Sequence, residues 1–213
     1  MGMRVAGISI PDSAMAQAAS TAVLASEPDI LYRHSLRVFL FSALIGRHRQ
    51  LSFDAELLYV AALFHSIGLT EPYHDSPRRF EVDGANAVLA FLASHCVPPE
   101  DLAEVWRAVA LHTTFGINDE MPPLTALIAA GVETDLLGTH FDEISRDERQ
   151  EVLHEFPRDT GFKELIIEAF AQGVNRRPTT AFGNVSADIL DRCDPNYRRL
   201  NFCGLILGSD WSE

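Results

Sequence analysis

The sequence predicts an all-α protein that folds as a single globular unit. Apolar residues recur at intervals of three and four along most of the chain, a spacing that places them on one face of a helix. The alternating patterns typical of strands are nearly absent. A chain of 213 residues with 47% hydrophobic residues is long enough to bury a sizeable core. We therefore expect one domain built from helices.

Capping residues and prolines divide this pattern into successive helices. Ser and Asp favour a helix start because the side chain accepts a hydrogen bond from a free backbone N–H, and Pro is tolerated in the first turn. The helix ending at Gly68 is apolar on almost every side and is expected at the centre. Helices are predicted over residues 13–27, 30–48, 54–67, 81–95, 99–112, 123–137, 145–155, 162–174 and 186–192.

We expect three segments along the chain. Residues 1–29 form an N-terminal helical extension, residues 30–178 the core, and residues 179–213 an irregular tail packed on the core. Ser145 and Glu148 have the spacing of a capping box, which marks the start of one helix within the core.

Composition narrows the class of partner. A formal net charge of −13 argues against binding to nucleic acid or to an anionic membrane, since both need a basic surface. Three cysteines without zinc-type spacing favour a reduced, cytoplasmic setting, and no targeting or membrane-spanning segment is recognised. The net charge says little about a small-molecule substrate in a closed pocket, and a homodimer is compatible with the sequence.

Two histidines and one aspartate stand out in apolar surroundings. His34 lies on the apolar face of its helix, and His65 ends the most buried helix. Asp135 lies in an apolar segment, where a buried carboxylate is costly without a cation or hydrogen-bond donors. Each residue alone has an ordinary structural explanation. Together, imidazole and carboxylate groups are the donors that zinc, iron and manganese sites recruit.

The order of these residues resembles that of the HD-domain superfamily, His…His-Asp…Asp. The segments 33–38 and 61–68 are similar to the family's HSxRV and aaLxHDIG motifs. The resemblance implies an HD-domain helical bundle and a divalent metal, Zn²⁺ first, with Fe or Mn as alternatives. Its ligands would be His34, His65 and Asp135. Ser66 occupies the position of the family's metal-binding aspartate. Since a serine hydroxyl is a poor ligand, we expect the metal to be weakly held or absent. Natural divergence and a deliberate substitution both remain open as its origin.

Over residues 32–177 the chain is further similar to HD-type cyanamide hydratases, through segments 79–86, 111–113 and 156–158. The resemblance implies addition of water to a small nitrile-type substrate, cyanamide giving urea, by a metal-activated hydroxide. His112 or His95 would then donate a proton to the substrate nitrogen, and Glu81 or Asp83 would orient that histidine. A helix end by itself also explains His95 and Asp83.

Three alternatives remain. A nucleotide or phosphomonoester hydrolase would need cations near the metal to hold phosphate. A di-iron oxygenase would use His34, His65, His95, His112 and Asp135, but it lacks the bridging carboxylate. A non-catalytic HD module would bind a ligand or partner through a vestigial site. The candidate phosphate-binding cations are Arg33, Arg37, Arg78, Arg79, Arg176 and Arg177.

Overall fold

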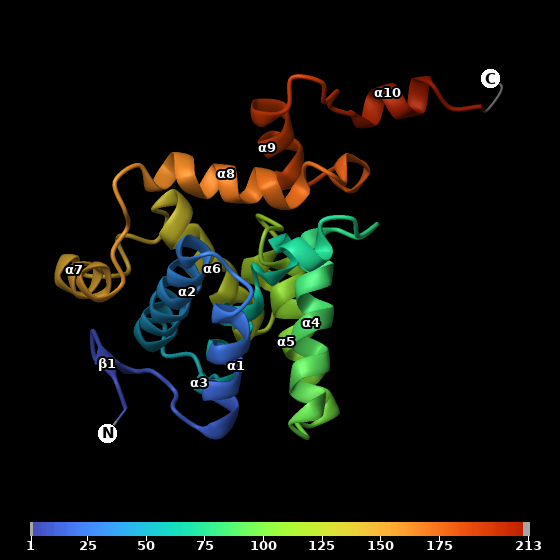
Figure 1. The fold of residues 1–213 in the computed structure, drawn as a ribbon. Helices are drawn as coiled ribbons and strands as arrows, with labels where there is room; N and C mark the ends of the chain where they lie inside the picture. Colours follow the sequence, from blue (N-terminus) through green and yellow to red (C-terminus); the bar gives the residue numbers. More distant parts are fainter. Residues whose placement is uncertain (1, 211–213) are drawn as a thin grey trace.

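A computed structural model describes residues 2–210 and confirms the predicted all-α fold (Figure 1). Nine of its helices follow the predicted ranges to within a few residues. They are α1 (Ala14–Leu24), α2 (Asp29–His48), α3 (Ala55–Phe64), α4 (Phe80–Ser94), α5 (Pro99–Leu111), α6 (Pro123–Leu137), α7 (Arg146–Glu155), α8 (Phe162–Val174) and α9 (Val185–Cys193).

Short elements connect or precede these helices, and the sequence pattern did not predict them. Strands β1 (Arg4–Val5) and β2 (Ile8–Ser9) pair antiparallel around Ala6 and Gly7, both of which have positive φ. Such a turn matches the twist of a hairpin and explains the glycine. The remaining elements are α10 (Phe202–Leu207) and four 3₁₀ turns, η1 (Ile67–Leu69), η2 (Glu71–Tyr73), η3 (Asn118–Glu120) and η4 (Pro178–Thr180).

Helix α3 lies at the centre of the bundle, as its sequence predicted. Every residue from Leu57 to Phe64 is buried, and α3 contacts α1, α2, α4, α5 and α6. Helices α2 and α6 pack directly against each other, and Gly131 lets their backbones approach. A Cβ at Gly131 would overlap Ser42 Oγ and would lie 2.6 Å from the Val38 carbonyl oxygen. Close packing therefore requires glycine at this position.

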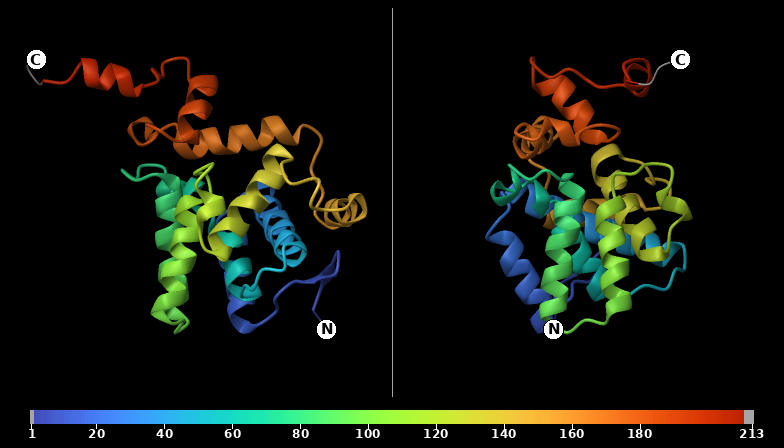
Figure 2. Two further views of the ribbon diagram at one scale, coloured as in Figure 1. Left: turned by 180° about the vertical axis from the view of Figure 1, so that it is seen from behind. Right: turned by 90° about the vertical axis from the view of Figure 1, so that its right-hand side faces the viewer.

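Helices α8 and α9 form a second layer across one end of the bundle (Figures 1 and 2). They enclose a separate apolar cluster in which Phe162, Ile166 and Phe170 of α8 meet Leu31 and Phe80 of the bundle. The last part of the tail behaves differently. Helix α10 extends away from the rest of the chain and has no buried residue. Within the tail, α9 packs on α8, whereas α10 has no buried residue.

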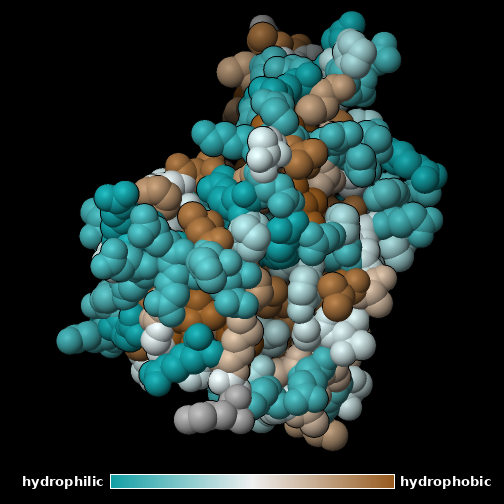
Figure 3. All heavy atoms as spheres, turned by 60° about the vertical axis from the view of Figure 1, so that its left-hand side comes forward, coloured by the Kyte–Doolittle hydropathy of each residue, from teal (hydrophilic) through white to brown (hydrophobic). Residues whose placement is uncertain are grey.

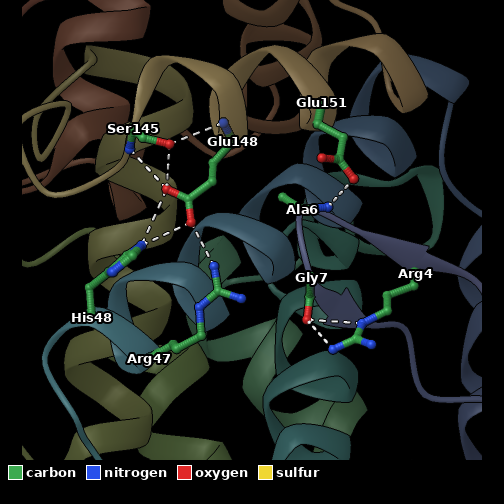
Figure 4. A network of polar contacts seen from close by, with 8 residues as sticks. All are labelled: Arg4, Ala6, Gly7, Arg47, His48, Ser145, Glu148 and Glu151. Carbon is green, nitrogen blue, oxygen red and sulfur yellow. Dashed lines mark hydrogen bonds and ion pairs between the residues drawn. The ribbon is translucent and has the colours of Figure 1, made fainter.

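Polar contacts join α7 to α2 and to the N-terminal hairpin (Figure 4). The capping box between Ser145 and Glu148 is confirmed. Glu148 also accepts hydrogen bonds from Arg47 (2.6 Å) and His48 (3.0 Å), while Glu151 accepts one from the Ala6 backbone N–H at 2.6 Å. These contacts attach the hairpin and α7 to the bundle.

The surface is mainly hydrophilic on the face shown in Figure 3, with hydrophobic atoms visible in several separate places. No helix within residues 2–210 combines the length and the apolar character that crossing a bilayer requires.

Candidate active site

Side chains from four elements of the bundle meet in a buried polar cluster. His34 comes from the second turn of α2, and His65 and His112 follow the last residues of α3 and α5. Asp135 lies in the last turn of α6. Each is at most 1% exposed, and Ser66 beside them is fully buried. The structure thus brings together four of the residues that the sequence singled out, plus the unexpected serine.

Asp135 is held by three hydrogen bonds. His34 Nδ1 donates to Oδ2 at 2.6 Å, while Arg37 donates from Nε to Oδ1 at 2.7 Å and from Nη2 to Oδ2 at 2.9 Å. Burial alone would raise the pKa of this carboxyl, but the hydrogen bonds from His34 and Arg37 outweigh burial and hold its pKa well below the usual range. Asp135 is therefore an anion paired with the buried Arg37.

The three histidine rings are oriented by the same kind of hydrogen bond. Each imidazole uses Nδ1 to donate to an oxygen: His34 to Asp135, His65 to the Ala62 carbonyl (2.6 Å) and His112 to the Val109 carbonyl (2.6 Å). Since these oxygens only accept, the proton of each neutral ring lies on Nδ1 and Nε2 keeps its lone pair. A fixed tautomer of this kind is the arrangement found in histidines that bind metals or accept protons.

The Nε2 atoms of His34 and His65 face each other inside the cluster. His65 Nε2 lies 3.2 Å from His34 Nε2 and 3.0 Å from Ser66 Oγ. The ring centroid of His65 is 5.0 Å from that of His34 and 5.0 Å from that of His112. Burial lowers the pKa of all three imidazoles, most strongly at His65, where the two neighbouring rings act in the same direction. The histidines are therefore neutral near pH 7.

A metal ion fits this donor set only in part. Two nitrogens bound to one tetrahedral zinc at about 2.05 Å lie about 3.3 Å apart, close to the 3.2 Å between His34 and His65 Nε2. A third ligand is missing. Both oxygens of Asp135 are engaged on the far side of His34, and Ser66 offers a neutral hydroxyl. Within residues 2–210, no group of three or more His, Cys, Asp or Glu side chains is arranged to hold a metal.

The predicted metal ligand Asp135 bonds to the Nδ1 side of His34, opposite the Nε2 atom that faces His65. We expected it to bind a metal together with His34 and His65, but the structure places it behind His34, as the carboxylate that orients the imidazole. From the sequence, Arg37 was expected only as a candidate for binding phosphate. Two signals could have predicted that Arg37 pairs with Asp135. Arg37 lies one helical turn after His34, and a buried Asp135 needs hydrogen-bond donors.

Glu81 lies beside His112 without bonding to it directly. It is fully buried and accepts hydrogen bonds from Thr113 Oγ1 (2.5 Å) and Arg79 (2.9 Å). Burial would raise its pKa, but Arg79 and the nearby His112 lower it overall. Thr113, which follows His112 in the chain, was not predicted as a site residue. Glu81 therefore influences His112 in two ways: its negative charge favours the protonated imidazole, and its hydrogen bond to Thr113 holds the residue that follows His112.

The structure does not bring His95 to the site. His95 is exposed at the end of α4, whereas Glu81 lies at its beginning. Fourteen residues of α-helix span about 21 Å. His95 Nδ1 bonds to the Phe91 carbonyl at 2.9 Å, and its ring lies 4.3 Å from that of Phe91. Asp83 is likewise occupied, since it pairs with Arg177 at 2.6 Å. A helix end accounts for His95.

Most arginines proposed for phosphate binding are already paired with carboxylates. Arg78 is exposed in the loop before α4. The pairs are Arg33 with Asp29 and Asp159, Arg37 with Asp135, Arg79 with Glu81, Arg176 with Asp75, and Arg177 with Asp83. A phosphate at the histidine cluster would have to compete with these carboxylates for their cations.

Residues 31–131 match the family model described as HD domain. This part of the chain is similar to HD domains. The match begins in α2, ends within α6, and contains His34, His65, Ser66 and His112, while Asp135 lies just beyond it. The HD superfamily consists generally of metal-dependent phosphohydrolases, and its domains typically bind divalent metals. No curated protein matches the chain.

Proposed function

We propose that this HD-domain protein is a hydratase-type enzyme that adds water to a small uncharged substrate, with cyanamide, giving urea, as the candidate. One observation carries the proposal. The buried cluster consists of neutral imidazoles, and the cation that touches it, Arg37, is neutralised by Asp135. Such a cluster suits a neutral molecule, because an anionic substrate would be desolvated there without a free counter-ion.

The chain's own residues support acid–base chemistry at His65. Its Nδ1–H is fixed on the Ala62 carbonyl, so Nε2 is the atom that takes a proton from water or returns one to substrate nitrogen. Asp135 plays the corresponding part for His34, whose proton it holds on Nδ1. His112 is fixed on the Val109 carbonyl and lies against Glu81, which favours its protonated form during turnover.

Ser66 limits this chemistry in the present chain. Its hydroxyl lies 3.0 Å from His65 Nε2 and donates to that atom, because Nδ1 already carries the imidazole proton. A hydrogen bond of this kind occupies the lone pair on which a base depends. The donor set also falls short of three protein ligands, so no step of the reaction is assigned to a metal here. We therefore expect weak activity from this chain and higher activity from Ser66→Asp.

The test is urea formation from cyanamide, with zinc supplied, by the chain and its Ser66→Asp variant. The expected result is activity that rises with aspartate, disappears when His65→Ala is added, and is unchanged by His95→Ala. The last substitution is a matched control, because His95 is an exposed histidine far from the cluster. Zinc-loaded Ser66→Asp protein that forms no urea would refute the proposal.

A phosphohydrolase is the second candidate, and two observations favour it. The HD superfamily generally consists of such enzymes. In addition, Arg158 lines a cavity with Asp135, and no carboxylate of residues 2–210 lies within ion-pair distance of its guanidinium. Hydrolysis of p-nitrophenyl phosphate by Ser66→Asp protein, lost on Arg158→Gln and retained on Arg107→Gln, would favour this candidate over the hydratase.

A further inference from the structure

A second cavity lies between α6, α8 and α9, outside the histidine cluster. Its volume of 370 Å³ falls within the range of small-molecule binding pockets. The walls are apolar side chains from all three helices. The residues that define them are Val132 and Leu136 of α6, Phe162, Ile166 and Phe170 of α8, and Ile189 of α9.

Two cations without partners line the same cavity. No carboxylate of residues 2–210 lies within ion-pair distance of Arg158 or Lys163. The one acidic residue in the lining, Asp188, is paired with Arg199 at 2.5 Å. The Arg158 guanidinium lies 4.1 Å above the ring of Phe162, and burial lowers its pKa. Lys163 is the only lysine in the chain.

This charge distribution is unusual for the molecule. The net charge is −13, and many of its arginines are paired with nearby carboxylates. Arg158 is half-buried against the ring of Phe162 and Lys163 is exposed at the cavity rim, so both cations are available to a ligand and neither has a carboxylate of the described chain within ion-pair distance. A neutral apolar ligand would fill the cavity but leave these charges unpaired. A ligand with one anionic end and an apolar body would satisfy both features.

We propose that this cavity binds an amphipathic monocarboxylate. The carboxylate lies on Arg158 and Lys163, and the apolar body lies between Leu136, Ile166 and Ile189. Arginine suits this role because its planar fork of N–H donors matches a carboxylate. The volume limits the ligand to a small molecule, which distinguishes this site from a surface for a protein or a lipid bilayer.

The cavity also has a path to the histidine cluster. Thr113 forms part of its wall, donates a hydrogen bond to Glu81, and follows His112 in the chain. A ligand that fills the cavity would therefore lie against the residue that links Glu81 to His112. The proposal does not rest on the hydratase activity, because binding is measured without turnover.

The experiment is isothermal titration calorimetry of the full chain with hexanoate, octanoate and 1-octanol. Each buried methylene strengthens hydrophobic binding about fourfold, so octanoate should bind about 16-fold more tightly than hexanoate. Octanol should bind more weakly than octanoate, because it leaves both cations unpaired. Arg158→Gln and Lys163→Gln should each weaken octanoate binding about tenfold and leave octanol unchanged. Arg107→Gln, on the exposed face of α5, is the matched control and should change neither.

Acylation of amines provides a second measurement. Octanoate should slow acetylation of Lys163, with the N-terminal amine as the internal reference in the same sample. The proposal is overturned if octanoate does not bind, if Arg158→Gln and Lys163→Gln leave its affinity unchanged, or if octanol binds as tightly. It is also overturned if octanoate does not slow acetylation of Lys163 relative to the N-terminal amine.

Discussion

Replacing Asp135 by Asn tests whether the buried network holds the bundle together. The substitution keeps the size of the side chain and removes its charge, leaving the 1% exposed Arg37 without a counter-ion. Three hydrogen bonds of 2.6, 2.7 and 2.9 Å are affected. Removing one partner of a buried ion pair costs about 3–5 kcal/mol. For a chain of this size, each kcal/mol lowers Tm by about 2–4 °C, so we expect a decrease of about 6–20 °C.

The assay is urea unfolding followed by far-UV circular dichroism, with a matched double variant. Arg37→Met combined with Asp135→Leu replaces both charges by apolar groups, which is often neutral for stability. The double variant should recover about half of the lost stability. A deficit of about 1–3 kcal/mol should remain, because His34 Nδ1 loses its acceptor.

The pH dependence gives an independent check. The folded-state pKa of Asp135 is lowered, so its contribution is present above the unfolded-state pKa and is lost as pH falls through the folded-state pKa. The stability difference between wild type and Asp135→Asn should therefore shrink below about pH 4. An Asn variant within about 1 kcal/mol of wild type at pH 7 would refute the reasoning.

Three further predictions concern single positions. Ser66→Asp adds a carboxylate beside His65 Nε2 and should raise the zinc retained after dialysis, measured by plasma mass spectrometry; equal zinc in both proteins would contradict this. Glu27 is buried with both oxygens unpartnered, and burial raises its pKa, so its stabilising contribution is complete below about pH 4.5 and is lost as pH rises through the folded-state pKa. Glu27→Gln should therefore be more stable than wild type at pH 8 and equal at pH 4 in urea unfolding, and a loss at both would contradict this. Gly131→Ala should cost about 1–3 kcal/mol, because its methyl group overlaps Ser42 and separates α2 from α6; an unchanged urea midpoint would contradict this.

The helices could be predicted because their signals are local. Prolines at the starts of α5 and α6 and the all-round apolar sequence of α3 depend only on neighbouring residues. The hairpin was missed because strands of two residues carry no periodicity. Helix α10 was missed because six residues without a buried face leave no amphipathic pattern.

The sequence indicated which residues lie close together, but not how their side chains are arranged. The order of His34, His65 and Asp135 identified residues that do meet, but the side of His34 on which Asp135 lies depends on Arg37, which the ligand pattern omits. The predicted helix 81–95 was already enough to separate His95 from the site. Glu81 and His95 lie at opposite ends of α4, and one helix cannot bring both to a single small site.

The distance along the chain between His34 and Asp135 has a consequence for biosynthesis. The two residues are separated by 101 positions, so at about 5–20 residues per second α6 leaves the ribosome roughly 5–20 s after α2. Throughout that interval Arg37 has no carboxylate, and burying the α2 face that carries it would be costly. The nascent bundle should therefore keep this face of α2 hydrated until Asp135 has been synthesised. Ribosome-bound chains that stop before residue 135 should remain open to protease within α2.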